Sequence, residues 1–146
     1  MTDKVAILGK LPTKFKAPFD DASWDIWTLN YHIEPLPRVN KWFDLHENEP
    51  NPRANITRKN YPFEEAEKLV CGQYFNNSIS YMIAFAILNG YKEIALYGMQ
   101  FKAEKETRRN GEYQSVREMI FFARGKGLKV TAPFDKVILQ EYPIYK

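Results

Sequence analysis

Short apolar runs alternate along this chain with segments of helical character, and this alternation constrains the fold more than any other feature. Each run has four to six residues, contains β-branched or aromatic side chains, and is followed closely by glycine, asparagine, histidine or proline. The predicted strands are residues 4–8, 24–29, 41–45, 93–97 and 128–131. The predicted helices are residues 63–70, 79–88 and 113–124. Strands that alternate with helices predict an α/β domain with about five mostly parallel strands.

The chain has the length and composition of one folded domain. Its 146 residues match the usual size of a domain, so we assign residues 1–146 to a single one. Apolar residues make up 45% of the chain, which is typical of globular proteins. The single cysteine, Cys71, excludes an intramolecular disulfide, and we expect a buried, unreactive thiol. We see neither a membrane-spanning run nor a signal-peptide pattern, so we expect a soluble cytoplasmic protein without membrane association.

The charge and the aromatic residues indicate which partners to expect. A formal net charge of +3 is too small to predict nucleic-acid binding. Aromatic residues make up 15% of the chain, and residues 137–146 are more apolar than a free terminus usually is. Because aromatic side chains are common at subunit interfaces, we expect a homo-oligomer, a dimer, to which this segment contributes. The alternative is that the segment packs on its own domain.

The predicted sheet indicates where a ligand would bind. In an open parallel sheet, ligands bind at the carboxyl ends of the strands, near the point where the strand order reverses. The candidate residues therefore follow a strand directly or open the helix that comes next. They lie in the segments 9–13, 30–32, 46–49, 76–80 and 98–101.

Two of these segments are candidate phosphate-binding elements. Gly9 permits a ligand to approach the backbone, and the Thr13 hydroxyl can reach a phosphate, although the loop has neither dinucleotide nor P-loop spacing. Asn76, Asn77 and Ser78 open the most apolar helix, and N–H groups at a helix N-terminus attract anions. The alternatives are a plain turn for the first segment and a simple helix cap for the second.

The two histidines are the candidates for proton transfer. His46 follows a strand, a histidine titrates near neutral pH, and Glu47 is its acidic neighbour, so we predict these two as catalytic residues. His32 follows the preceding strand and is a candidate ligand contact. The alternative for His46 is a partly buried ring bonded to backbone. Neither histidine has a metal-binding spacing, so we expect no metal and no cofactor.

Residues 76–98 resemble a signature of bacterial sialyltransferases and of the motility-associated (MptE-like) glycosyltransferases. The stretch begins NNSISYM and ends NGYKEIALYG. In those families, a serine pair and a methionine occur in the first part and a GYKEI motif in the second. The first loop, GKLPT at 9–13, is similar to their G-x-G-P-S loop, and Asn30 matches the asparagine after their second strand. Small Rossmann-like bacteriophage proteins share this pattern and add a third strand of the form WF-(D/E)-x-H. That form matches WFDLH at 42–46, so this group gives the best match.

The resemblance implies a compact Rossmann-like three-layer sandwich that binds a nucleotide. In the sialyltransferases, the first loop, the asparagine and the serine pair hold a cytidine nucleotide. The corresponding candidate contacts are Gly9, Thr13, Asn30, Asn77 and Ser78. Gly98 and Gln100, after the fourth predicted strand, complete the ligand-binding candidates, although the families usually have an aspartate where Gln100 stands. No residue here corresponds to the sialyltransferase general base, which a helical lid carries.

Three functions stay open from the sequence. The first is a metal-independent transferase or hydrolase that acts on a nucleotide or a nucleotide-linked sugar, with His46 as the acid or base. The second is a phage-type protein that sequesters a nucleotide signal without turnover, in the host cytoplasm. The third is an adaptor with an aromatic protein-binding surface.

Overall fold

The computed structural model describes residues 2–32, 34–99, 107–134 and 136–139. It contains one parallel sheet of six strands in the order β4-β3-β2-β1-β5-β6. The strands are β1 (Lys4–Leu8), β2 (Trp24–Leu29), β3 (Lys41–Asp44), β4 (Ile56–Thr57), β5 (Glu93–Tyr97) and β6 (Lys129–Thr131). The α-helices are α1 (Phe63–Leu69), α2 (Ser78–Leu88) and α3 (Thr107–Gly125), and two 3₁₀ helices are η1 (Pro12–Lys16) and η2 (Lys136–Leu139). The predicted Rossmann-like α/β fold is confirmed.

The sheet has one strand more than the five we predicted. The additional strand, β4, lies within the polar stretch 46–62 and contains only two residues. Ile56 pairs with Phe43 and Thr57 pairs with Asp44, so β3 serves as the template for β4. Two residues are too few to form an apolar run that the sequence could reveal. β4 forms because its backbone pairs with β3, and local sequence pattern does not predict that pairing.

The chain order within the sheet places the switch point between β1 and β5. The chain steps outward from β1 through β2 and β3 to β4, and then returns to pair β5 with the other side of β1. Val5, Ala6, Ile7 and Leu8 are fully buried, as expected for an interior parallel strand. The carboxyl ends of β1 and β5 therefore border the position at which ligands bind in such sheets.

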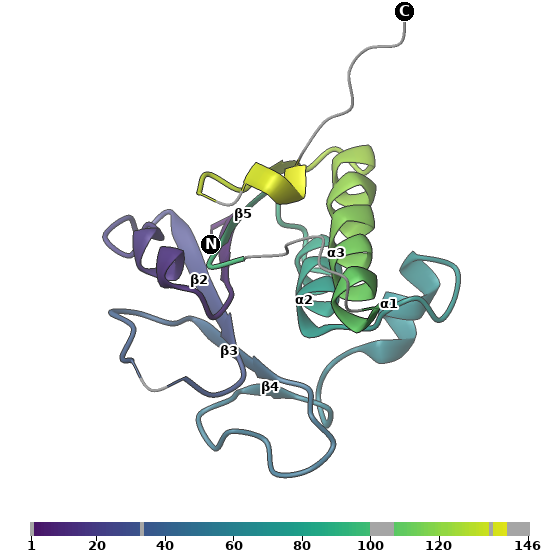
Figure 1. Cartoon of the computed structure of the whole chain (residues 1–146), viewed down its shortest axis with the longest axis horizontal. Helices are drawn as coiled ribbons and strands as arrows, with labels where there is room; N and C mark the ends of the chain where they lie inside the picture. Colours follow the sequence, from purple (N-terminus) through teal and green to yellow (C-terminus); the bar gives the residue numbers. More distant parts are fainter. Residues whose placement is uncertain (1, 33, 100–106, 135, 140–146) are drawn as a thin grey trace, which may run out of the picture.

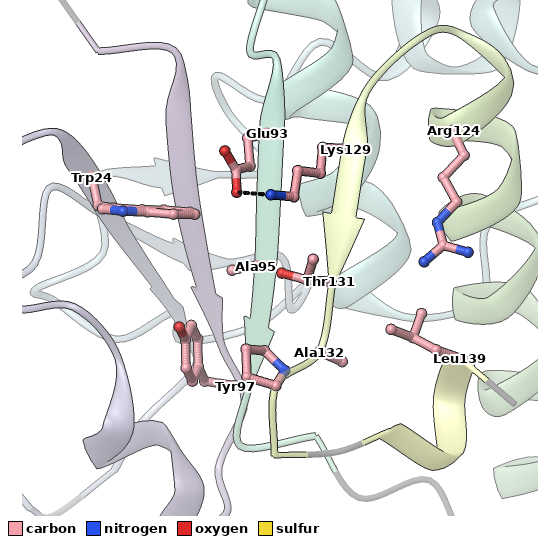
Figure 2. A pocket seen from close by; sticks show the side chains of 10 residues that line it. Trp24, Glu93, Ala95, Tyr97, Arg124, Lys129, Thr131, Ala132 and Leu139 are labelled. Atoms are coloured by element: carbon pink, nitrogen blue, oxygen red, sulfur yellow. Dashed lines mark ion pairs between the residues drawn. The ribbon is translucent and has the colours of Figure 1, made fainter.

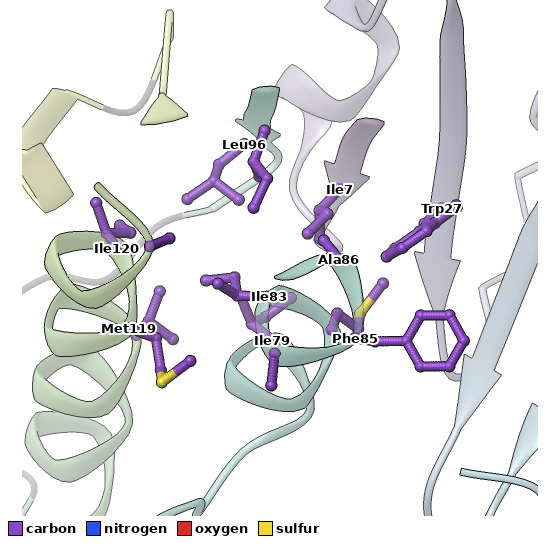
Figure 3. Packing of buried hydrophobic residues seen from close by; sticks show 14 of the residues in the cluster. Ile7, Trp27, Ile79, Ile83, Phe85, Ala86, Leu96, Met119 and Ile120 are labelled. Atoms are coloured by element: carbon purple, nitrogen blue, oxygen red, sulfur yellow. The ribbon is translucent and has the colours of Figure 1, made fainter. Parts of the chain in front are cut away.

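The three α-helices lie on the same side of the sheet (Figure 1). Ile7, Trp27 and Leu96 project from the sheet into the main core, where they meet Ile83 of α2 and Ile120 of α3 (Figure 3). Seven of the eleven residues of α2 are buried, which agrees with its apolar character on all sides. α3 begins at Thr107, before the predicted start at residue 113, in a polar stretch without a strong start signal.

The opposite face of the sheet is covered by loops and by η1. A second, smaller core contains Ala6, Leu8, Ile26 and Tyr97, and Ala17 of the loop after η1 packs onto it. The reason lies in the connections: β1, β2 and β3 are joined by η1 and irregular segments, whereas α1, α2 and α3 occur only after β4. The outer layer on this side is consequently thin, with no described α-helix in it.

The position of Cys71 differs from the one that the sequence predicted. Cys71 is exposed, so the prediction of a buried thiol is wrong. The residue occupies a left-handed turn after α1, with φ 60°, and does not belong to the apolar face of a helix.

The C-terminal segment that we predicted to form a subunit interface is described only in part. Ile138 is 1% exposed and belongs to the main core, while residues 140–146 lie outside the described residues. Within the described part of the chain, none of the helices combines the length and apolar character that a membrane span requires.

Candidate functional site

Gly9 and Gly98 follow the two strands at the switch point, and their backbones are in contact. The Gly9 N–H donates to the Tyr97 carbonyl at 2.7 Å, and the Leu11 N–H donates to the Gly98 carbonyl at 3.2 Å. A Cβ atom on Gly9 would overlap the Gly98 carbonyl oxygen, and Gly98 adopts a φ of 69°. The Gly98 N–H donates to Thr13 Oγ1 at 2.9 Å. The structure thus brings three predicted site residues together, and it explains both glycines by backbone packing.

Asn30 lies at the end of β2 in a left-handed conformation, with φ 56°. Its N–H donates to the Phe43 carbonyl at 2.7 Å, and its own carbonyl accepts from the indole N–H of Trp42 and from Asn51 Nδ2 at 3.1 Å. The Asn30 side-chain oxygen, Oδ1, is buried and has no hydrogen-bond partner in the described part of the protein. A buried acceptor without a partner is uncommon in folded proteins, and it is satisfied when water or a ligand supplies a donor.

Asp44 and His46 form a hydrogen-bonded pair at the end of β3. His46 Nδ1 donates to Asp44 Oδ1 at 2.6 Å, and the His46 backbone N–H donates to the same oxygen at 3.1 Å. The side chain of Asp44 is 6% exposed, whereas that of His46 is 64% exposed. A buried carboxylate therefore orients an imidazole that solvent can reach. The predicted alternative for His46, a partly buried ring bonded to backbone, is wrong.

The charge on Asp44 is maintained by hydrogen bonds. Burial alone would raise its pKa, but N–H groups of Asn51 and His46 donate to the carboxylate and bring the pKa below its ordinary value. The Asn51 backbone N–H donates to Asp44 Oδ2 at 2.9 Å. Asp44 is thus an anion at neutral pH and is suited to stabilise a protonated His46 ring.

Asn51 connects the two strand ends, and the sequence did not mark it as a site residue. Its backbone binds Asp44 and its side-chain amide donates to the Asn30 carbonyl, so the ends of β2 and β3 share one network. The Arg53 N–H donates to Asn51 Oδ1 at 3.0 Å, and the Arg53 guanidinium lies 4.8 Å from the centre of the Trp42 ring. Asn51 lies in a polar, proline-containing loop. The local sequence there indicates only the tendency of asparagine to form an Asx turn, so it did not predict a site residue.

His32 belongs to the same edge but is held differently from His46. Its ring stacks on Trp42, with centroids 5.0 Å apart and planes 11° apart. Nε2 lies 3.2 Å from Thr28 Oγ1, and Nδ1 lies 3.1 Å from the Glu34 carbonyl oxygen. Burial lowers the pKa of His32 below its usual value. The ring is consequently neutral at pH 7, and it serves as a packed wall beside the site rather than as a charged group.

Lys14 is a further residue that the sequence did not mark. It belongs to η1 and is 1% exposed, although lysine is seldom buried. Its ammonium nitrogen lies 3.3 Å from Glu34 Oε2 and 3.4 Å from the Lys10 carbonyl oxygen. A cation thus lies next to the predicted edge residues, within the structure rather than on its surface.

The predicted helix start is mainly occupied by its own cap. Asn77 Oδ1 accepts from the Ser80 N–H at 2.9 Å, and Asn77 Nδ2 donates to Asn76 Oδ1 and to Ser80 Oγ. Ser80 Oγ in turn lies 2.8 Å from Ser115 Oγ of α3, in a buried contact. These contacts give Asn77 the role of an N-cap, which was the alternative to phosphate binding. A ligand role for Asn76, Asn77 and Ser78 stays a prediction.

The remaining predicted residues contribute less to this geometry. Glu47 is exposed next to His46, and Gln100 lies outside the described residues. No group of three or more His, Cys, Asp or Glu side chains that could hold a metal occurs among residues 2–32, 34–99, 107–134 and 136–139. The core of the candidate site is therefore the network of Asp44, His46, Asn51 and Asn30.

A pocket of about 570 Å³ lies elsewhere, over β5 and β6 (Figure 2). Ala95 and Thr131 lie on its sheet side, Trp24 and Tyr97 on one flank, and the ion pair of Glu93 with Lys129 spans the two strands. None of the described residues predicted for the site lines it. The pocket is on the sheet face that the α-helices leave open.

Comparisons with known protein families, curated proteins and solved structures found no match to this chain. The functional conclusions below therefore depend on the geometry of the site and on general chemistry.

Proposed function

We propose that this protein binds a phosphate-bearing small molecule, a nucleotide or nucleotide-linked sugar, at the carboxyl ends of β1, β2 and β3. We further propose that His46 acts as a general acid or base in a transfer or hydrolysis reaction on that ligand. The observation that carries the proposal is the pair in which buried Asp44 orients exposed His46. An acid or base must reach the substrate, and this ring is exposed at the edge where such sheets bind ligands.

The hydrogen bonds support a specific division of roles within the pair. With Nδ1 bonded to Asp44, proton transfer to and from substrate falls to Nε2, which makes no hydrogen bond with any described residue. Asp44 keeps the ring in one tautomer and stabilises the cation that forms when Nε2 takes a proton. Asn51 in turn holds the second carboxylate oxygen in place.

A turnover assay with a panel of nucleotides and nucleotide sugars tests the proposal. The chain is incubated with each compound, and both product and protein-bound ligand are measured. We expect turnover of at least one compound, and we expect His46→Gln to reduce the rate by about 10²–10⁴ while affinity changes by no more than a few-fold. Asn48→Ala, an exposed change in the same loop, is the matched control.

The possible outcomes separate the functions that the sequence left open. Stoichiometric retention of a nucleotide without product would show sequestration rather than catalysis. Turnover that persists in His46→Gln at the rate of Asn48→Ala would exclude His46 as the acid or base. If no compound of the panel is either retained or turned over, the proposal as a whole is overturned.

We also propose that two copies associate through the open face of β5 and β6. Phe134 is 52% exposed there and its ring lies 6.2 Å from that of Tyr97, next to a pocket that Trp24 also lines. Aromatic rings of this kind are enriched at subunit interfaces. Light scattering at micromolar concentration should give a mass near twice 17.2 kDa. Phe134→Asp should reduce it to that of one chain, whereas Tyr31→Asp, which changes another exposed ring, should not.

A further inference from the structure

Lys14 is a buried lysine whose ammonium group lies near Glu34, the Lys10 carbonyl and the face of the Phe15 ring. Its side chain is 2% exposed, whereas the side chain of its ionic partner, Glu34, is 59% exposed. The distance from Lys14 Nζ to Glu34 Oε2 is 3.3 Å, and the distance to the Lys10 carbonyl oxygen is 3.4 Å. Charge-assisted hydrogen bonds are typically about 2.7–2.9 Å long. The ammonium group thus has an anionic partner, but a distant one that solvent largely surrounds.

The position of Lys14 is at the switch point of the sheet. η1 follows β1 directly, and a Cβ atom on Gly98 would lie 3.0 Å from the Cβ of Lys14. The carbonyl of Glu34 contacts His32, which follows β2. Lys14 and Glu34 therefore lie where β1, β2 and β5 end, and His32, which stacks on Trp42, connects Glu34 to the edge at which the candidate site lies.

A structural ion pair alone does not account well for this arrangement. Burial of an ammonium group is costly unless an anion neutralises it at close range. Glu34 is mostly in water, where an ion pair contributes little, so the pair offsets only a small part of that cost. Sites that bind charged ligands have this property, because the ligand supplies the neutralising charge.

We propose that Lys14 is an anion-binding residue, and that a ligand phosphate takes the place that the Glu34 carboxylate occupies in the free protein. Glu34 then acts as a built-in competitor, which leaves Lys14 when phosphate enters and returns to it when phosphate dissociates. The choice of phosphate rests on the proposed function, whereas the exchange itself depends only on Lys14 and Glu34. Because Glu34 is exposed, it can leave without disturbing the core.

Titration with inorganic phosphate and pyrophosphate, followed by calorimetry and ³¹P NMR, tests this inference. Glu34→Gln removes the competing charge, so we expect it to bind pyrophosphate about fivefold more tightly than the unmodified protein. Glu65→Gln on α1 makes the same change of charge at an exposed position and should leave the affinity unchanged. Lys14→Met should abolish the binding, whereas Lys16→Met, an exposed change in the same 3₁₀ helix, should retain it.

The inference is overturned if Glu34→Gln binds no more tightly than Glu65→Gln, or if folded Lys14→Met binds as well as Lys16→Met. It is also overturned if neither anion binds to the protein or to Glu34→Gln at millimolar concentration. Circular dichroism shows whether Lys14→Met folds; if it does not, the Glu34→Gln comparison decides alone. If Glu34→Gln binds pyrophosphate more tightly and Lys14→Met does not bind it, the inference holds even when no nucleotide is turned over. That result would contradict only the proposal that the protein is an enzyme.

Discussion

Gly9 and Gly98 lie against each other at the switch point, with no room for a side chain between them. The Gly9 N–H donates to the carbonyl of Tyr97, directly before Gly98, and a Cβ atom on Gly9 would overlap the Gly98 carbonyl oxygen. This contact joins the ends of β1 and β5. It also positions η1, because Thr13 accepts the Gly98 N–H and Leu11 donates to the Gly98 carbonyl.

Gly9→Ala should therefore destabilise the fold by about 3 kcal/mol, because the overlap involves backbone that no rotamer change can relieve. Chemical denaturation monitored by tryptophan fluorescence gives the free energy of unfolding. Gly125→Ala serves as the control, since no atom outside its own stretch of α3 lies within 4 Å of the new methyl group. Equal stability of the two variants would show that the switch point is not packed as described.

Asp44→Asn should cost about 1.5–3 kcal/mol at pH 7, because it weakens three hydrogen bonds to a buried charge. The folded pKa of Asp44 is depressed, so the charged form stabilises the protein above the unfolded pKa, about pH 4. That stabilisation is lost as the pH falls through the folded pKa. Unfolding measured from pH 7 to pH 3 should show the two proteins converging in acid, whereas exposed Asp20→Asn should differ little throughout.

His32 should make the protein less stable in mild acid. Burial lowers its pKa, so the unfolded chain binds the proton more readily than the folded protein does. Stability contributed by neutral His32 is fully present above about pH 6.5 and falls as the pH drops below that value. Thermal unfolding at pH 7.5 and pH 5.5 should show a smaller decrease in Tm for His32→Gln than for the unmodified protein. An identical decrease would contradict the assignment.

Asn77→Ala should cost about 1 kcal/mol of stability, because it removes the side chain that caps α2. Asn76→Ala should cost less, since Asn76 is exposed and its side-chain oxygen accepts from the neighbouring Asn77 side chain rather than from a backbone N–H of the helix. Urea denaturation distinguishes the two. If this helix start binds phosphate, Asn77→Ala should also lower the affinity for pyrophosphate. The loss should be measurable under conditions in which the variant is fully folded, so that reduced stability does not account for it.

The sequence by itself determined the elements whose signals are local. Apolar runs of β-branched and aromatic residues predicted β1, β2, β3 and β5, and Asn77 with Asn89 and Gly90 bounded α2, because strand burial and helix capping depend on neighbouring residues. The alternation of these elements was sufficient for the Rossmann-like α/β fold. It also placed His46 at a strand end, since residues that follow parallel strands share one edge.

Tertiary structure decided what depends on contacts between distant segments. β4 exists because Ile56 pairs with Phe43, and Cys71 is exposed because of a turn that its apolar neighbours do not reveal. Lys14 is buried and pairs with Glu34, 20 positions away, where composition predicts an exposed lysine. Asn51 joins Asp44 to Asn30 across a loop whose sequence shows only turn residues. Propensity and periodicity describe a residue's neighbours along the chain, whereas burial of a charge and the partner of a carboxylate depend on which distant segments the fold brings together.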